Sequence, residues 1–89
     1  MALITNSLIE MLTTGNQLKA ARALAGMNQQ GLANAAGVDV NTIRNMEKSG
    51  NGLIAGRAES VIAVSKALEA KGVAFIPENG GGPGVRLKS

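Results

Sequence analysis

The chain has 89 residues and is 45% hydrophobic, yet Phe75 is its one aromatic residue, and 9 basic residues outnumber 6 acidic ones for a net charge of +3. This length suffices for one small domain whose core is built from aliphatic side chains. The lack of Cys and His removes disulfides, thiolate chemistry and the commonest metal ligand and acid–base group. We therefore expect no enzyme, no metal site and no cofactor. With no apolar run near the ~20 residues of a membrane span and no secretory signal pattern at the start, we expect a cytoplasmic protein.

Residues 1–14 read as an N-terminal extension that is mostly apolar up to Leu12. Two interpretations stay open for it, a short helix lying against the domain or a partner, and a frayed tail. A first helix is predicted from residue 15 or 16 to Ala25, where Gly26 ends it.

Two short helices with a tight turn between them are predicted next, at residues 29–36 and from just after Asp39 to near Lys48. Asn28 and Asp39 are good N-caps for them. Ala33 is small enough to let the two helices approach closely, and Gly37 can adopt φ > 0 in the turn at little cost. A common core is predicted for Leu32, Val38, Ile43 and Met46.

The remainder of the chain begins with a loop at residues 49–52 and a fourth helix at about 57–71, with Val61, Val64 and Leu68 on one side. Gly72 ends that helix. Residues 73–76 and 85–87 are β-prone, and the Gly- and Pro-rich stretch between them lacks the lysine of a phosphate-binding loop. We predict a two-stranded ribbon, which gives three parts: the extension 1–14, a helical domain 15–72 and a C-terminal ribbon 73–89.

The spacing Gln29-x-x-Leu32-Ala33-x-x-x-Gly37-Val38 with Ile43-x-x-Met46 resembles the helix-turn-helix of the Xre/Cro-type phage-repressor family. The resemblance extends to Leu18-x-x-Ala21-Arg22 upstream and to Glu47-Lys48-Ser49-Gly50 downstream. It implies a mainly α fold, a four- to five-helix phage-repressor-like helix-turn-helix domain with a short C-terminal β-ribbon. It also implies an internal salt bridge between Arg22 and Glu47.

The resemblance further implies that the second helix of the motif reads base edges in the major groove of double-stranded DNA. An Asn side chain can pair with adenine, an Arg with guanine, and a Val can contact a thymine methyl group. The base-reading residues are then Val40, Asn41, Arg44 and Asn45. The residues expected to bind DNA phosphates are Gln29, Thr42, Lys48, Asn51 and Arg57. The residues expected to support the structure are Arg22, Ala33, Gly37, Ile43 and Glu47.

The function implied is a sequence-specific DNA-binding transcriptional regulator, most simply a repressor, with its own promoter as one candidate target, and activation by contact with polymerase is also open. A homodimer would read a palindromic operator with recognition helices about 34 Å apart. The strand at 73–76 is apolar on both faces, so its cover must come from the domain or from a second subunit, and the sequence favours the second subunit. The alternative is a protein-interaction module, such as the antitoxin of a toxin–antitoxin pair, in which DNA binding is secondary.

Overall fold

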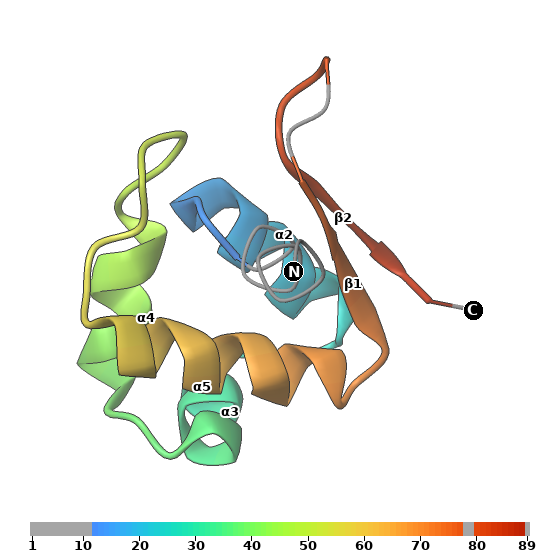
Figure 1. The fold of residues 1–89 in the computed structure, drawn as a ribbon. Helices are drawn as coiled ribbons and strands as arrows, with labels where there is room; N and C mark the ends of the chain where they lie inside the picture. The colour runs from blue at the N-terminus through green and yellow to red at the C-terminus, as the bar shows by residue number, and fades with distance from the viewer. Residues whose placement is uncertain (1–11, 78–79, 89) are drawn as a thin grey trace, which may run out of the picture.

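Residues 12–77 and 80–88 are described by the computed structural model, in which four helices precede a two-stranded antiparallel sheet (Figure 1). The predicted mainly helical domain with a C-terminal ribbon is confirmed. The predicted short helix in the extension lies outside the described residues. The elements in chain order are α2 (Gly15–Leu24), α3 (Gln29–Ala36), α4 (Val40–Glu47), α5 (Ala58–Glu69), β1 (Val73–Ile76) and β2 (Gly84–Leu87).

Side-chain caps fix where the first three of these helices begin. Asn28 accepts a hydrogen bond from the Gly31 amide at 2.7 Å, and Asp39 accepts one from the Asn41 amide at 2.7 Å, as predicted. At the start of α2, Thr14 caps the amide of Gln17, whose side-chain oxygen in turn accepts from the Thr14 amide. This reciprocal arrangement satisfies backbone donors that a helix start leaves unpaired.

The turn at residues 37–39 joins α3 to α4, and Gly37 adopts the left-handed conformation there, with φ of 72°. Ala33 on α3 is fully buried and α3 packs against α4, as expected for a small residue between closely packed helices. The hydrophobic core consists of Leu12, Leu18, Ala21, Leu32, Ala33, Ile43, Met46, Val64, Leu68, Val73 and Phe75.

The N-terminus of α2 meets the C-terminus of α4 at very short range. A Cβ atom on Gly15 would lie 2.6 Å from the carbonyl oxygen of Met46 and 2.8 Å from that of Glu47. The amide of Asn16 also donates to the carbonyl of Gly50 at 2.8 Å. The absence of a side chain at position 15 therefore lets α2 approach the end of α4, and this approach positions the site described below.

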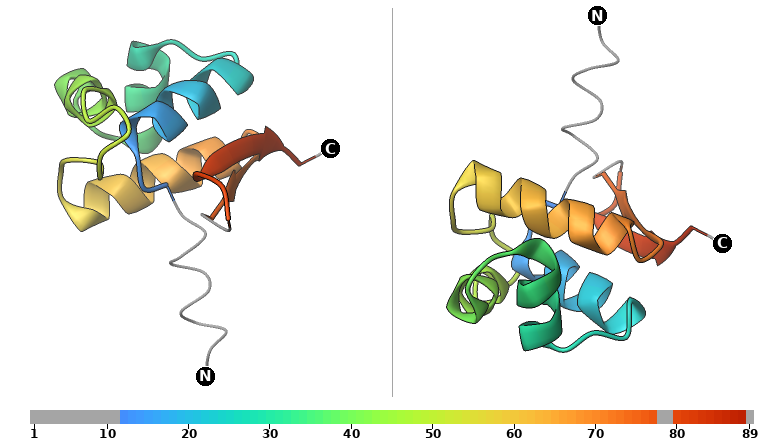
Figure 2. Two further views of the ribbon diagram at one scale, coloured as in Figure 1. Left: turned by 90° about the horizontal axis from the view of Figure 1, so that it is seen from above. Right: turned by 90° about the horizontal axis from the view of Figure 1, so that it is seen from below.

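The hairpin lies on the opposite side of the domain from α4, with α2 between them (Figures 1 and 2). Val73 pairs with Leu87 and Phe75 with Val85. Val73 and Phe75 are buried in the core. The domain itself therefore covers this face of β1, whereas Ile76 on the other face is exposed, and a second subunit as the cover of that other face stays a prediction. The Gln17 amide nitrogen also donates to the carbonyl of Gly84 at 3.1 Å and fastens β2 to α2.

Candidate nucleic-acid interface

The outer face of α4 carries three polar side chains that are exposed, Asn41, Arg44 and Asn45. They stand opposite Ile43 and Met46, which are fully buried, so the amphipathic pattern fixes which face is outward. Arg44 donates a hydrogen bond to the side-chain oxygen of Asn41 at 3.1 Å. The predicted reading residues Asn41, Arg44 and Asn45 thus share one accessible surface.

Val40 differs from these three residues. The sequence places it on the same outer face, but its side chain is half-buried and packs against the core. Only part of Val40 faces outward, because the first turn of α4 lies close to the rest of the domain.

A bidentate ion pair joins α2 to the end of α4, as predicted for Arg22 and Glu47. Arg22 Nε donates to Glu47 Oε2 at 2.7 Å and Arg22 Nη2 donates to Glu47 Oε1 at 3.2 Å. The side chains are 19% and 6% exposed. The hydrogen bond to Glu47, aided by the attraction of its charge, raises the pKa of Arg22 against the opposing effect of burial. The remaining Arg22 nitrogen, Nη1, donates to the carbonyl of Met27 at 3.1 Å.

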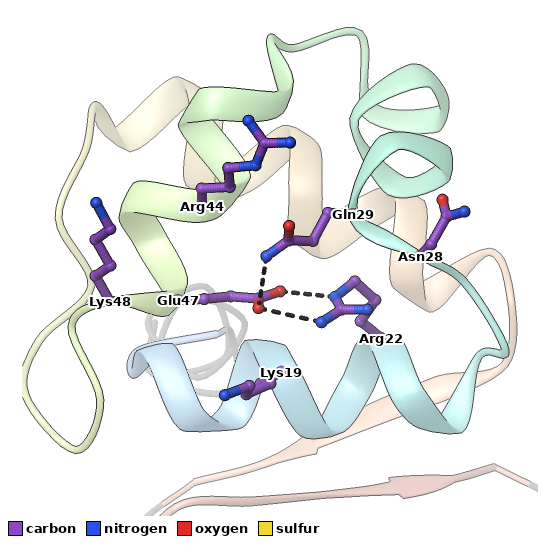
Figure 3. Close-up of a pocket in the computed structure, with 7 residues that line it drawn as sticks. All are labelled: Lys19, Arg22, Asn28, Gln29, Arg44, Glu47 and Lys48. Atoms are coloured by element: carbon purple, nitrogen blue, oxygen red, sulfur yellow. Dashed lines mark hydrogen bonds and ion pairs between the residues drawn. The ribbon is translucent and has the colours of Figure 1, made fainter.

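Gln29 joins this pair instead of pointing freely into solvent. Its amide nitrogen donates to Glu47 Oε1 at 3.1 Å, so Glu47 accepts from three donor atoms on two side chains (Figure 3). The sequence predicts a phosphate contact for Gln29, and in the structure one of its amide hydrogens already has this internal acceptor. The network ties α2, α3 and α4 together at one point.

An open groove of about 640 Å³ surrounds the network, between α2, the start of α3 and the end of α4. Its basic side chains outside the buried ion pair are Lys19, Arg44 and Lys48 (Figure 3). None of these three has an ion-pair partner among the residues that the structure describes. The groove therefore presents a net positive charge, and a positively charged concavity attracts anions. The complete lining is Lys19, Arg22, Asn28, Gln29, Arg44, Glu47 and Lys48.

Lys19 was not among the residues that the sequence predicts for the site. It lies three residues before Arg22 on α2, and this spacing puts both on one helical face. The sequence feature that could have identified Lys19 is its position one helical turn before Arg22, the predicted ion-pair residue.

The other predicted phosphate contacts lie outside the lining of this groove. Thr42 is half-buried within α4. The side-chain oxygen of Asn51 accepts a hydrogen bond from Asn16 at 2.7 Å. Arg57 has an 84% exposed side chain and lies 3.7 Å from Glu59 in a loose pair. The structure thus brings Gln29 and Lys48 together with Arg44 and leaves Thr42, Asn51 and Arg57 apart from them.

No model of a known protein family matches the sequence, and no characterised protein matches it closely enough to show a relationship. The relation to Xre/Cro-type regulators stays a prediction from the motif residues. In the described part of the chain, no helix has the length and apolar character to cross a membrane. Over the same residues, no group of three or more His, Cys, Asp or Glu side chains is placed to hold a metal ion.

Proposed function

We propose that the protein is a sequence-specific DNA-binding transcriptional regulator of the Xre/Cro type that inserts α4 into the major groove. The observation that carries the proposal is the exposed polar face of α4 beside a groove whose cations Lys19, Arg44 and Lys48 have no ion-pair partner in the described part of the chain. Polar side chains on a helix supply base readout, and neighbouring cations supply attraction to the phosphates.

The reading chemistry follows from the side chains on α4. A protruding helix fits the width of the major groove, where each base pair shows its own pattern of donors and acceptors. Arg44 suits the two acceptors of guanine, and Asn41 or Asn45 suits the donor and acceptor of adenine. Arg44 and Asn41 are joined to each other in the unbound protein and would exchange that bond for bonds to bases.

Contacts to the DNA backbone would come from the groove and from the start of α3. Lys48 follows the last residue of α4. The side-chain amide of Gln29 belongs to the first residue of α3, at the helix N-terminus, where the helix dipole favours an anion. Contacts of this kind position the domain without reading sequence and make affinity fall with salt.

One copy of α4 has eight residues and spans few base pairs, so specificity on a genome calls for two copies. We propose a homodimer that binds a palindromic site and represses by occluding a promoter, its own promoter being one candidate. Two half-sites one helical turn apart would match a two-fold axis in the protein.

Selection of bound sequences from a random double-stranded DNA pool tests this function. The expected result is an enriched palindrome that binds more tightly than unselected DNA, with an affinity that falls as salt rises. A Lys71→Ala variant removes one exposed cation outside the groove, and as a control it should select the same palindrome as wild type. A pool without enrichment would contradict the proposal of sequence-specific binding.

Exposed apolar side chains favour the second candidate, a protein-interaction module such as an antitoxin. Leu53 is 83% exposed, and Leu24, Ile76 and Leu87 are also exposed. Single exposed leucines are common on soluble domains, so this observation is weaker than the basic groove. Random-pool selection separates the two functions, since a module without a DNA role enriches no sequence.

A further inference from the structure

Glu47 is an acidic residue placed where the proposed function needs positive charge. It lines the same groove as Lys19, Arg44 and Lys48. An unpaired carboxylate there would repel any phosphate that entered the groove, because like charges at short range oppose each other strongly outside bulk water. A phosphate-binding groove around Glu47 therefore requires that its charge be offset.

The structure offsets this charge through contacts to both carboxylate oxygens. Both carboxylate oxygens accept from Arg22, and Oε1 accepts from Gln29 as well. The Glu47 side chain is only 6% exposed. Hydrogen bonds from a guanidinium on both oxygens hold the carboxylate in one orientation and balance its charge. What remains for a ligand is the positive charge of the three unpaired side chains.

Lys19 is the cation that completes this groove on the α2 side. Lys48 follows α4, Arg44 lies on α4, and Lys19 approaches from α2, with Glu47 bonded to Arg22 and Gln29 between them (Figure 3). The side chain of Lys19 is exposed and makes no ion pair within the described residues.

We propose that Lys19 binds a backbone phosphate of DNA from the α2 side of the groove, and that Arg22 is a positioning residue that makes this possible by offsetting the charge of Glu47. The inference rests on the proposed DNA-binding function and adds a residue and a charge mechanism to it. Arg22 serves the fold by joining α2 to α4 and serves binding by offsetting the charge of Glu47, the acidic residue that lines the groove.

Titration of duplex DNA with Lys19→Ala tests the phosphate contact, with Lys66→Ala as the matched control. Lys66 is also an exposed lysine on a helix, α5, and lies outside the groove. A lysine that neutralises a phosphate contributes about 0.9 to the slope of log affinity against log salt. If that contact contributes nothing at about 1 M salt, its loss weakens binding about eightfold near 0.1 M salt. We expect this loss at any DNA sequence for Lys19→Ala and much less for Lys66→Ala. Equal affinities and equal salt slopes for the two variants would overturn the role of Lys19.

The role of Arg22 is tested by Arg22→Gln and by the double variant Arg22→Gln/Glu47→Gln. The single variant leaves Glu47 unbalanced and so cancels one unit of positive charge in the groove, and we expect DNA affinity to fall about eightfold near 0.1 M salt, at a temperature where circular dichroism shows a folded chain. The double variant removes both charges, and we expect most of the affinity to return. A double variant that binds as weakly as the single one would overturn the charge mechanism. If the single variant does not fold, the double variant against wild type still tests the mechanism, since both have a balanced groove, and a folded double variant that binds DNA clearly more weakly than wild type would overturn it.

These outcomes are distinguishable from failure of the proposed function itself. If wild-type protein binds no DNA at any salt concentration, the proposed function is wrong. If wild-type protein binds DNA but Lys19→Ala matches Lys66→Ala, the function stands and the Lys19 inference alone is wrong.

Discussion

Replacing Glu47 with Ala should remove a large share of the stability of this domain. The side chain is 6% exposed and accepts from Arg22 Nε, Arg22 Nη2 and Gln29 Nε2. Its loss leaves a charged guanidinium that keeps only the Met27 carbonyl as acceptor. Removing one partner of a buried pair typically costs about 3–5 kcal/mol. Because Arg22 is 19% exposed and water can reach it, we expect the lower part of that range, about 3 kcal/mol.

Thermal and urea unfolding followed by far-ultraviolet circular dichroism measure this effect. For a domain of this size, each 1 kcal/mol lowers Tm by about 4–8 °C, so Glu47→Ala should melt roughly 12–24 °C below wild type. Glu59→Ala is the matched control, because Glu59 is 78% exposed and lies 3.7 Å from Arg57. An exposed pair contributes about 0–1 kcal/mol. Similar melting temperatures for both variants would refute the assignment of Arg22–Glu47 as a clamp between α2 and α4.

Three further expectations concern stability and use the same unfolding assays. Gly15→Ala places a Cβ 2.6 Å from the Met46 carbonyl oxygen, so α2 must shift and we expect a loss of about 1–3 kcal/mol, whereas an unchanged urea midpoint would contradict the close approach. Phe75→Ala removes a core side chain that is 7% exposed and should cost about 3–5 kcal/mol, while a cost under about 1 kcal/mol would mean that the hairpin is not part of the core. Because Glu47 raises the pKa of Arg22, the contribution of Arg22 is fully present below the ordinary guanidinium range and is lost only as pH rises through the raised pKa. Between about pH 6 and 9, deprotonation of Arg22 should therefore cause no loss of stability. A fall in the free energy of unfolding over this range that Glu47→Ala abolishes would contradict the raised pKa of Arg22.

Local signals predicted most of the helix boundaries correctly. Asn28 and Asp39 cap α3 and α4 where the sequence places them, and Gly37 adopts the left-handed turn. Caps and turn glycines act over three or four neighbouring residues, so a linear sequence contains the information that they need. The start of α2 has such a signal too, since Thr14-x-x-Gln17 is a capping-box pattern that places the first helical residue at Gly15.

The residues that depend on how helices cross were harder to predict. Gly15 is required by the carbonyls of Met46 and Glu47, which are remote in sequence. Lys19 joins the groove only because α2 approaches the end of α4 at that point. A single sequence specifies the faces of each helix through its periodicity, but it does not specify the distance and angle at which two faces meet.

Hydrogen-bond partners within the site also depend on the assembled structure. Gln29 and Asn51 are polar and near the predicted interface, and both have an internal partner, Glu47 and Asn16 respectively. The sequence predicts that these two side chains lie near the interface, but it does not predict whether each binds an internal partner or a phosphate. Either partner can accept a hydrogen bond from a side-chain amide. For Arg22 and Glu47, the prediction came from the resemblance to the Xre/Cro-type motif, because opposite charges on two helices do not by themselves specify a pair.

The central claim is that the outer face of α4 reads DNA sequence, and the most direct test compares the sequences selected by wild type, Arg44→Ala and Lys48→Ala from one random pool. Arg44 is exposed on α4, whereas Lys48 follows its last residue. Loss of a base contact should weaken binding by about 1–3 kcal/mol and relax one position per half-site, while loss of a phosphate contact should weaken binding to all sequences. We therefore expect Arg44→Ala to lose its preference at one base pair and Lys48→Ala to keep the wild-type preference with lower affinity. An unchanged preference in Arg44→Ala, or no preference in wild type, would contradict the account.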